Sequence, residues 1–449
     1  MRFYSCIKTG IENPDSSLGC YATNPCDYSD FHGFFDAVIR DYHGGTSGKK
    51  KHVTDWETAQ DKYDVGELGV DKLSMRVRVG RNLVGFNLPA TMTKSGRIDF
   101  EKKMIPVFEQ LKSKYGGTYH SLSPDLGENE PNPNLISDEK YKSLVADHVM
   151  FNDMSSDPYL NSAGISSDWP YGRGCWQSED KMRVIWVGEE DQLRIMCMKE
   201  GTNLLDVFTN LKEMLDTMES IDGVQFASHE DYGYLTSCPS NLGTGMRASV
   251  HIKVPALTAD GTDTMLKHLC KPLGFSVRGT GGEHTPFVNG TIDISPSSRL
   301  FVSEGDIISS LYSGIKDIVM IDKRVASNLD CLSAVESNQE AEKSVTDDGE
   351  EIKILIKDEE EDTSVDINSK ESTTVEADDD KRDEQAMNFV LVTNTDRDQE
   401  EREQEEQHIE SMKEKVKSTK VCTSDRSMSS LSPRSLNVSP SPTLAITNE

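Results

Sequence analysis

A cysteine, an arginine and a histidine stand close together in the segment TSCPSNLGTGMRASVHIKVPAL, residues 236–257. Cys238 precedes a short polar turn, and apolar and polar residues alternate over 248–254, which is the period of a β-strand. Arg247 therefore lies where a loop enters a strand, and it can present a fixed cation to an anionic ligand. A buried structural cysteine beside an ordinary strand explains the same residues, so this segment alone leaves both interpretations open.

Three further segments add arginines and carboxylates. In LSMRVRVGRN, Arg76 and Arg78 share one face of a predicted strand. In VIWVGEEDQLRIMCM, two apolar runs flank three consecutive carboxylates, and Arg194 follows them. Arg278 precedes a glycine-rich loop that contains Glu283. A guanidinium group can donate two parallel hydrogen bonds to two phosphate oxygens. A carboxylate can accept two hydrogen bonds from a guanidino group in the same geometry. The combination suggests phosphoryl transfer from a nucleotide to a basic nitrogen.

The elements that must position these side chains are predicted from hydrophobic spacing. Residues 204–218 carry apolar residues three and four apart, which is typical of an amphipathic helix. A similar pattern begins at Ile307, behind Ser303 and Asp306, whose spacing is that of a helix N-terminal capping pair. We therefore expect helices in both regions, between and after the arginine-bearing strands.

Cysteine content and hydropathy bound the class of protein. The chain has nine cysteines without paired spacing and no CxxC motif, so neither a zinc ribbon nor a disulfide scaffold is expected. A reducing cytoplasm is the expected compartment, and it would keep Cys238 as a free thiol. No apolar run is long enough to span a bilayer and no secretory leader is recognisable, so a membrane is not an expected partner.

Negative charge is concentrated at the end of the chain. The formal net charge is −29, and from Ala326 onward 14 Lys and Arg face 32 Asp and Glu. This charge argues against nucleic acid as a partner. Few apolar residues and a large like charge prevent packing, so residues 326–449 are predicted to form a disordered, acidic tail with a Ser/Pro-rich end. The tail is expected either to act as a solvating segment or to bind unknown protein partners.

Six motifs, taken in order, resemble those of the phosphagen (guanidino) kinases, and most closely arginine kinases: RVRVGRN, WPYGRG, VGEEDQLR, CPSNLGT, RASVHIKVP and RGTGGEHT. The resemblance extends from about Cys6 to Lys323. It implies an α+β fold in which a small α-helical N-terminal domain precedes a large catalytic domain with a curved antiparallel sheet flanked by helices. The predicted strands and helices agree with this fold. The implied parts are an N-terminal domain, a linker, a catalytic domain and the tail, at residues 1–48, 49–70, 71–325 and 326–449.

The N-terminal segment resembles the end of the family's small domain, where a D-S-x-x-G-x-Y loop closes over the guanidino substrate. The helices that precede this loop in the family are missing, so either the N-terminal domain is truncated or the chain starts late. The residues that match the loop are Asp15, Ser16, Ser17, Leu18, Gly19 and Tyr21. Of these, the resemblance implies that Ser16, Ser17, Leu18 and Tyr21 bind the substrate.

The resemblance implies in-line transfer of the γ-phosphoryl group of MgATP to a guanidino nitrogen, with ATP and ADP as nucleotides. Glu190 and Glu283 would align the guanidinium, and proton acceptance would be secondary because a carboxylate among arginines is a weak base. Cys238 would be a thiolate, its pKa lowered by cations and by the Ser240 hydroxyl. The phosphates would be held by five arginines, Arg76, Arg78, Arg194, Arg247 and Arg278. Adenine would pack against His251, and ribose would lie near Asp293. Mg²⁺ would be held through water by Glu189 and Asp191.

Within the family, Glu283 in its GEHT context and the retained Tyr21 favour L-arginine as the small-molecule acceptor. A taurocyamine-type kinase is one alternative. A protein arginine kinase, which phosphorylates arginine side chains of proteins, is another, because GYLTSCPSNLGTGMRAS and VPAL resemble that branch. A non-catalytic scaffold that uses the acidic tail is a third, and the complete set of arginines and carboxylates disfavours it.

Overall fold

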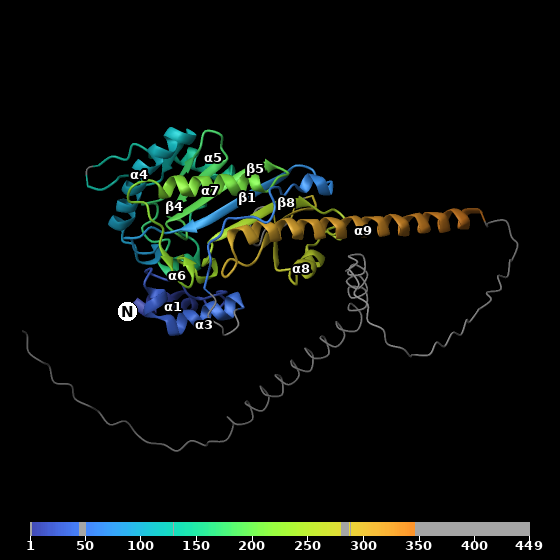
Figure 1. Cartoon of the computed structure of the whole chain (residues 1–449), viewed down its shortest axis with the longest axis horizontal. Helices are drawn as coiled ribbons and strands as arrows, with labels where there is room; N and C mark the ends of the chain where they lie inside the picture. The colour runs from blue at the N-terminus through green and yellow to red at the C-terminus, as the bar shows by residue number, and fades with distance from the viewer. Residues whose placement is uncertain (1, 45–50, 129, 280–286, 288, 346–449) are drawn as a thin grey trace, which may run out of the picture. The chain divides into compact units, whose positions relative to one another are not determined.

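Three helices form the N-terminal part of the molecule. The computed structural model describes residues 2–44, 51–128, 130–279, 287 and 289–345. Phe35 and Ile39 pack with Cys6 in a small hydrophobic cluster. The N-terminal helices are α1 (Arg2–Glu12), α2 (Asp27–Asp30) and α3 (His32–His43), and α1 contacts α6 (Pro158–Ala163) of the larger part (Figure 1).

An eight-stranded antiparallel sheet lies at the centre of the larger part. Its strand order is β2-β3-β4-β5-β1-β8-β10-β9. Together with the small helical N-terminal part and the flanking helices, this sheet confirms the predicted fold class. The strands are β1 (Leu73–Arg81), β2 (Thr118–Ser121), β3 (Gly174–Gln177), β4 (Arg183–Val187), β5 (Leu193–Gly201), β8 (Met246–Lys253), β9 (Phe275–Arg278) and β10 (Thr291–Pro296).

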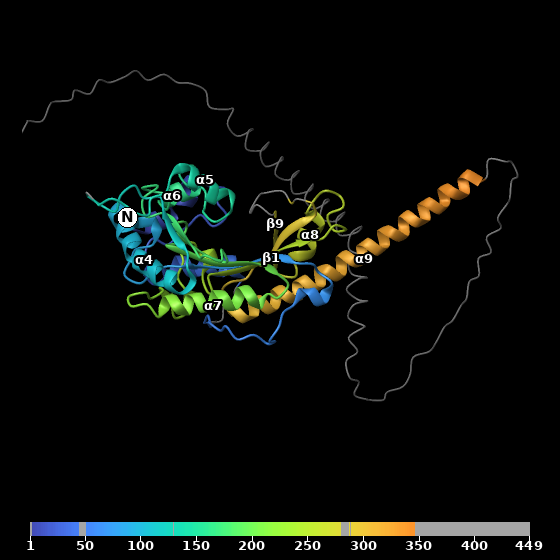
Figure 2. The ribbon, with the colours of Figure 1, turned by 90° about the horizontal axis from the view of Figure 1, so that it is seen from above.

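One face of the sheet forms the main hydrophobic core. Along β1 the side chains of Met75, Val77 and Val79 are buried, and the residues between them are more exposed. Apolar residues of three long helices join the same core. Figure 2 shows α7 and α9 on one side of the sheet and α5 (Asp138–Ala146) and α6 on the other. The three helices of the core are α4 (Lys94–Tyr115), α7 (Leu205–Glu219) and α9 (Glu304–Val345).

The two helices predicted from hydrophobic spacing are both present. Val207, Leu211 and Leu215 of α7 are buried, as the three-and-four spacing requires. The capping pair before α9 is also formed, because Ser303 Oγ accepts from the Asp306 N–H at 3.0 Å and an Asp306 carboxylate oxygen accepts from the Ser303 N–H at 3.1 Å.

The start of the acidic tail needs a correction. Disorder was predicted from Ala326, but α9 continues without interruption to Val345. Extending a helix that already exists costs little, so helical structure can pass the point where the hydrophobic pattern ends. The remainder of the predicted tail, residues 346–449, lies outside the described residues.

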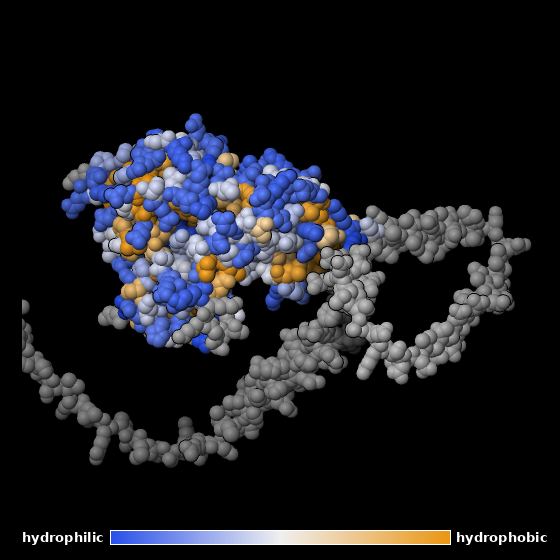
Figure 3. All heavy atoms as spheres, in the orientation of Figure 1, coloured by the Kyte–Doolittle hydropathy of each residue, from blue (hydrophilic) through white to orange (hydrophobic). Residues whose placement is uncertain are grey.

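One face of the molecule is mostly hydrophilic (Figure 3). Hydrophilic residues cover much of the face shown in Figure 3, and apolar residues gather over the region of α8 (Thr264–Cys270), where Met265 and Leu273 are exposed. Among the described residues, no helix combines the length and the hydropathy that crossing a membrane requires.

Candidate active site

The sheet face opposite the core carries the predicted phosphate-binding arginines. The strand register places Arg78 of β1 directly opposite Arg247 of β8. Arg76 lies two residues from Arg78 and therefore points to the same side. Strand β5 pairs with the other edge of β1, and its Arg194 lies opposite Gly80 of β1. Directly opposed side chains share a face, so three adjacent strands supply one cluster of cations.

The outer strands extend this face. Asp293 of β10 lies opposite His251 of β8 and also opposite Arg278 of β9. Burial lowers the pKa of Arg76, Asp293 opposes that shift, and repulsion from Arg194 and Arg278 adds to it. The strand register and the pKa shifts therefore both place the five predicted arginines, His251 and Asp293 on one face of the sheet.

Arg78 lies at the centre of the cluster. Burial lowers its pKa strongly, and repulsion from Arg194, Arg76 and Arg247 acts in the same direction. Within the described part of the chain, no hydrogen bond or ion pair holds the guanidinium groups of Arg76 and Arg78. A guanidinium stays protonated in a protein, so a bound polyanion is what relieves such repulsion. The cluster is therefore suited to phosphate groups.

Asp293 orients one of these arginines. Its Oδ2 lies 2.5 Å from Arg247 Nη2, and Ser295 Oγ accepts from Arg247 Nε at 3.0 Å. Asp293 is buried, and its Oδ1 lies 3.8 Å from His251 Nε2. A contact of Asp293 with ribose stays a prediction, whereas its hold on Arg247 is present in the structure.

The turn between β4 and β5 presents the three consecutive carboxylates. Arg194 Nη2 lies 2.8 Å from Glu189 Oε2 and 3.7 Å from Glu190 Oε2. The Arg194 guanidinium carbon also lies 5.2 Å from the centre of the Trp186 ring. Arg194 thus joins the cation cluster to the carboxylate turn.

Glu190 has an unusually high proton affinity. Burial raises its pKa to about 7, repulsion from Glu189 and Asp191 contributes, and Arg194 and Arg299 oppose the shift. The prediction that this carboxylate is a weak base is therefore wrong for the ligand-free protein. Burial and two neighbouring carboxylates outweigh the cations around it.

The surroundings of Cys238 favour its protonated thiol in the ligand-free protein. Its Sγ lies 3.0 Å from Ser240 Oγ, and the side chain is buried. Burial raises the pKa of Cys238 well above its usual range, Glu190 raises it further, and the Ser240 hydroxyl lowers it. The predicted effect of Ser240 is thus present, while burial and Glu190 act against the predicted thiolate when no ligand is bound. A guanidinium bound between Glu190 and Cys238 would favour the charged form of both groups.

Asp191 holds the loop that carries Cys238. Its Oδ1 accepts from Asn82 Nδ2 at 2.8 Å and from the Ser237 N–H at 2.6 Å. Burial raises the pKa of Asp191, and both hydrogen bonds oppose that rise. The other oxygen faces Gly80, where an added Cβ would lie 2.7 Å from it. The carboxylate is therefore largely committed to internal contacts, and a water-mediated hold on Mg²⁺ stays a prediction.

The N-terminal loop reaches the same place. Burial raises the pKa of Tyr21, and Glu190 and Cys238 raise it further, so the ring lies within electrostatic range of both groups. The Ala22 N–H donates to the Ser237 carbonyl at 2.7 Å. Tyr21 thus lies within electrostatic range of the predicted acceptor-binding groups, on a loop bonded to the residue before Cys238.

The preceding residues of this loop are ordered by local contacts. Ser16 Oγ accepts a backbone N–H of the loop at 3.2 Å, and Leu18 packs on the N-terminal hydrophobic cluster. Asp15 Oδ2 accepts from the Tyr159 hydroxyl at 2.8 Å, which ties the loop to α6. Substrate contacts of Ser16, Ser17 and Leu18 stay a prediction.

Arg299 is a site residue that the sequence did not reveal. Its Nη1 donates to the Ser240 carbonyl at 3.1 Å and to Asn241 Oδ1 at 2.8 Å. Asn241 Nδ2 in turn donates to Glu190 Oε2 at 3.3 Å. Burial lowers the pKa of Arg299, while the nearby Glu190 and Cys238 raise it. Arg299 follows β10 in an irregular loop, so no spacing rule points to it.

His148 is a second residue that the sequence did not reveal. It lies after α5 with a φ of 57°. Burial lowers the pKa of His251, and His148 is one of the nearby charges that contribute to the shift. His148 therefore lies within electrostatic range of His251, although 103 positions in sequence separate the two residues. A lone histidine in a loop carries no pattern that would have marked it.

The structure leaves open the predicted role of Glu283 and the predicted binding of Mg²⁺. Glu283 lies outside the described residues, so its predicted role is not tested by the structure. In the ranges that are described, no group of three or more His, Cys, Asp or Glu side chains could hold a metal ion.

Comparison with known proteins places this geometry in context. The model of the ATP:guanido phosphotransferase C-terminal catalytic domain matches residues 99–325, and the model of the N-terminal domain of the same family matches residues 1–40. The chain is 38% identical over 317 residues to a protein named arginine kinase Oct f 2 from Amphioctopus fangsiao, covering 70% of this chain and 85% of that protein.

Two further similarities involve other acceptors. The creatine kinase testis isozyme of Oncorhynchus mykiss is 34% identical over 330 residues, covering 71% of this chain and 81% of that protein. Among solved structures, the substrate-free duplicated taurocyamine kinase from Schistosoma mansoni superposes with a TM-score of 0.62 and 34% identity, covering 71% of this chain and 43% of that one.

Proposed function

This chain belongs to the ATP:guanido phosphotransferase family, and we propose that it transfers the γ-phosphoryl group of MgATP reversibly to L-arginine. Membership of the family makes it a phosphotransferase with a guanidino acceptor. One observation carries the proposal: the arginine cluster adjoins a buried pair, Glu190 and Cys238, that lies beside Tyr21 of the N-terminal loop. The arginines that suit phosphate groups thus lie next to the acidic side chains that suit a guanidinium.

The arginine face supports the donor side of the reaction. Arg76 and Arg78 have guanidinium groups without protein partners in the described ranges, so they are free to bind phosphate oxygens. Arg247 is fixed by Asp293 and Ser295 before any ligand binds. Charge that is positioned in advance needs no reorganisation during phosphoryl transfer, and such preorganised electrostatics is usually the largest catalytic contribution.

The Glu190–Cys238 pair supports the acceptor side. Burial and nearby acids raise the pKa of both groups in the ligand-free protein. Binding of a guanidinium between them would lower the pKa of both groups and release a proton. Glu190 would then be ionised, and its carboxylate would orient the nucleophilic nitrogen and stand ready to accept the proton that leaves it.

Magnesium is the ion proposed to accompany the nucleotide. Mg²⁺ usually binds through one or two carboxylates together with substrate phosphates, and it keeps several waters. Glu189 fits this pattern, because it lies on the carboxylate turn beside Arg194. Asp191 fits less well, since Asn82 and Ser237 already use its Oδ1. When bound, the ion would neutralise part of the phosphate charge.

L-Arginine is favoured over the other acceptors of the family for two reasons. Tyr21, which the sequence associates with arginine, lies beside Glu190 and Cys238. The relative named arginine kinase is 38% identical to this chain. Taurocyamine is the main alternative, because a taurocyamine kinase of known structure shares 34% identity. A protein side chain is a poorer candidate, since the N-terminal loop is bonded to Ser237, next to Cys238, and favours a small acceptor.

A coupled assay of ADP release tests the proposal. MgATP would be combined with L-arginine, taurocyamine, creatine or a denatured protein, and kcat/KM compared. We expect the highest value with L-arginine, and loss of turnover in Glu190→Gln but not in Glu200→Gln, which changes an exposed carboxylate at the far end of β5. A preference for taurocyamine or for denatured protein would replace L-arginine by that acceptor. ADP release without any acceptor would overturn the proposal.

A further inference from the structure

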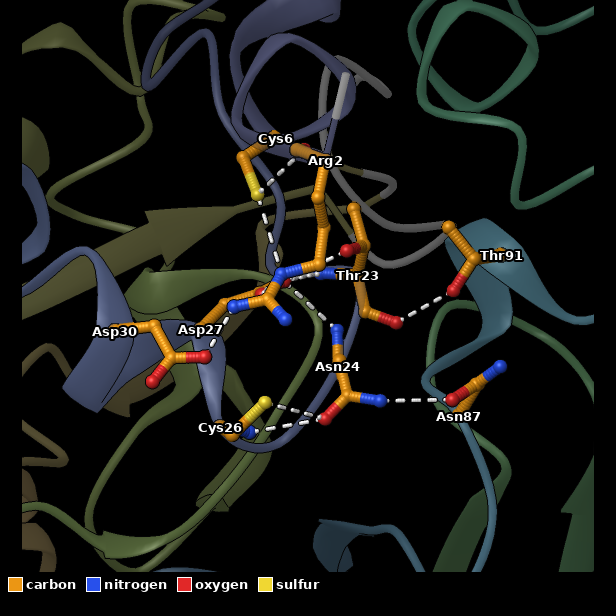
Figure 4. Close-up of polar contacts among 9 residues, drawn as sticks. All are labelled: Arg2, Cys6, Thr23, Asn24, Cys26, Asp27, Asp30, Asn87 and Thr91. Carbon is orange, nitrogen blue, oxygen red and sulfur yellow. Dashed lines mark hydrogen bonds and ion pairs between the residues drawn. The ribbon is translucent and has the colours of Figure 1, made fainter.

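A buried carboxylate in the N-terminal part collects hydrogen bonds that no sequence motif announced. Asp27 is 0% exposed. Its Oδ2 accepts from the Thr23 N–H and the Thr23 hydroxyl, each at 2.7 Å, and from the Asn24 N–H at 2.9 Å. The Cys6 thiol donates to the same oxygen at 3.4 Å. Figure 4 shows these donors converging on Asp27.

The other oxygen of this carboxylate is also engaged. Arg2 Nε lies 2.8 Å from Asp27 Oδ1, and the same guanidinium reaches the exposed Asp30. Burial raises the pKa of Cys6 to about 12, and Asp27 adds to the rise, so the thiol remains a donor. A buried charge with this many donors fixes the conformation of the segment that supplies them, because breaking any contact leaves the charge less compensated.

The segment that Asp27 fixes is bonded to the catalytic part of the chain. The Thr23 carbonyl accepts from the Leu88 N–H at 3.1 Å and from the Thr91 hydroxyl at 2.7 Å. Asn24 Nδ2 donates to Asn87 Oδ1 at 2.7 Å (Figure 4). The loop is therefore clamped from two sides, by Asp27 within the N-terminal part and by residues 87–91 of the larger part.

This clamp continues into the candidate active site. Gln192 Nε2 donates to the Asn87 carbonyl at 2.9 Å, so the contact point of the loop is tied to the carboxylate turn. One residue before Thr23, the Ala22 N–H bonds to Ser237, which precedes Cys238. Tyr21 stands next in the chain, within electrostatic range of Glu190 and Cys238.

We propose that Asp27 is a positioning residue for phosphoryl transfer: it holds residues 21–24 in the conformation that places Tyr21 over the Glu190–Cys238 pair. Asp27 does not touch the acceptor, and it acts only through this loop. The arginine face is built on the sheet and has no contact with Asp27, so nucleotide binding does not depend on it. The inference rests on the proposed acceptor site, and it predicts an effect on the acceptor alone.

Asp27→Asn tests the inference in the full chain. It removes the charge and replaces one acceptor oxygen by an amide donor that faces the Arg2 guanidinium or the Thr23 donors. We expect kcat/KM for the guanidino acceptor to fall by about 10-fold or more, since a displacement of about 1 Å near reacting groups costs up to roughly 10²-fold. The KM for MgATP should stay at the wild-type value.

Asp30→Asn is the matched control, because it removes only the exposed partner of Arg2. Exposed ion pairs contribute little, so its kcat/KM should stay within about 2-fold of wild type. Thr23→Val serves where Asp27→Asn fails to fold: it removes one donor to Asp27 and keeps the branched shape, and it should lower kcat/KM for the acceptor in the same direction. A folded Asp27→Asn or Thr23→Val with wild-type kinetics for the acceptor would overturn the proposal, as would an equal loss for acceptor and MgATP.

Hydrogen exchange of the amides of residues 16–24 supplies a readout that needs no turnover. Faster exchange in Asp27→Asn than in wild type or Asp30→Asn is expected, and equal exchange in all three would contradict the positioning role. If wild type used none of the guanidino acceptors, the proposed function would fail, while this comparison would still decide whether Asp27 fixes the loop.

Discussion

The proton affinity of Glu190 predicts how the rate depends on pH. With a pKa of about 7, Glu190 is about one tenth ionised at pH 6 and about nine tenths ionised at pH 8, so a step that needs the carboxylate should accelerate about 10-fold over this range. An exposed glutamate would be fully ionised throughout and give no change. Initial rates of ADP release, with both substrates well below their KM, report ionisation of the free enzyme. They measure the acid limb, which is the part of the pH profile where the rate rises with pH.

Glu189→Gln perturbs the cause of the shift. Repulsion from Glu189 is the largest contribution to the raised pKa of Glu190 after burial. Removing that charge should move the acid limb to lower pH, even though the absolute rate falls because Glu189 also faces Arg194. Glu200→Gln should leave the limb in place, since Glu200 is exposed and pairs with Lys72. An acid limb that stays in place in Glu189→Gln, or moves to higher pH, would refute the electrostatic account of this site.

The same shift predicts a stability change with a definite sign. The pKa of Glu190 is raised in the folded protein, so its protonated form stabilises the fold, and that contribution is lost as pH rises from the unfolded value through about 7. Glu190→Gln mimics the protonated side chain. Its Tm should therefore exceed that of wild type at pH 8, and the difference should shrink as pH falls to 5, because less of the contribution is lost there. A lower Tm at pH 8 would contradict the assignment.

Three further outcomes are expected. Cys238→Ala should lower kcat by about 10²-fold or more while the KM for MgATP changes little, because the thiol acts on the acceptor and preorganised contacts have effects of this size; a wild-type rate from pH 6 to 9 would remove that role. Arg247→Lys and Arg278→Lys should restore little of the turnover lost in the alanine variants, because a point charge cannot replace the bidentate guanidinium. Full rescue by lysine would mean that these arginines act only through their positive charge. Deletion of residues 346–449 should leave kcat and both KM values unchanged, whereas a KM for MgATP that falls on deletion in a salt-dependent manner would make this segment a regulatory element.

The resemblance to phosphagen kinases supplied the fold class and the site assignments, and local patterns supplied several of the strands and helices. The alternation around Arg76 and Arg78 predicts their shared face, and the alternation after Arg247 predicts β8. What such patterns lack is the register that sets Arg78 opposite Arg247. That pairing joins residues far apart in the chain, so it becomes visible only in the sheet.

Protonation states and internal partners could not be predicted from sequence. Glu190 and Cys238 were both assigned to the acceptor site, but their pKa values depend on burial, which a residue pattern does not give. Asp191 was assigned to the metal, whereas its Oδ1 bonds to Asn82, a residue far earlier in the chain. Arg299 enters from a loop without any periodicity.

We propose that a phosphoryl group moves from ATP to a guanidino nitrogen at the edge between the arginine face and the Glu190–Cys238 pair. ³¹P NMR of a reaction of the full chain with MgATP and L-arginine detects this transfer, because a phosphoryl group bonded to nitrogen resonates apart from inorganic phosphate. We expect a nitrogen-bonded phosphoryl signal that grows in step with ADP and is lost in Glu190→Gln. ADP accompanied only by inorganic phosphate, or the same nitrogen-bonded signal at the wild-type rate in Glu190→Gln, would contradict it.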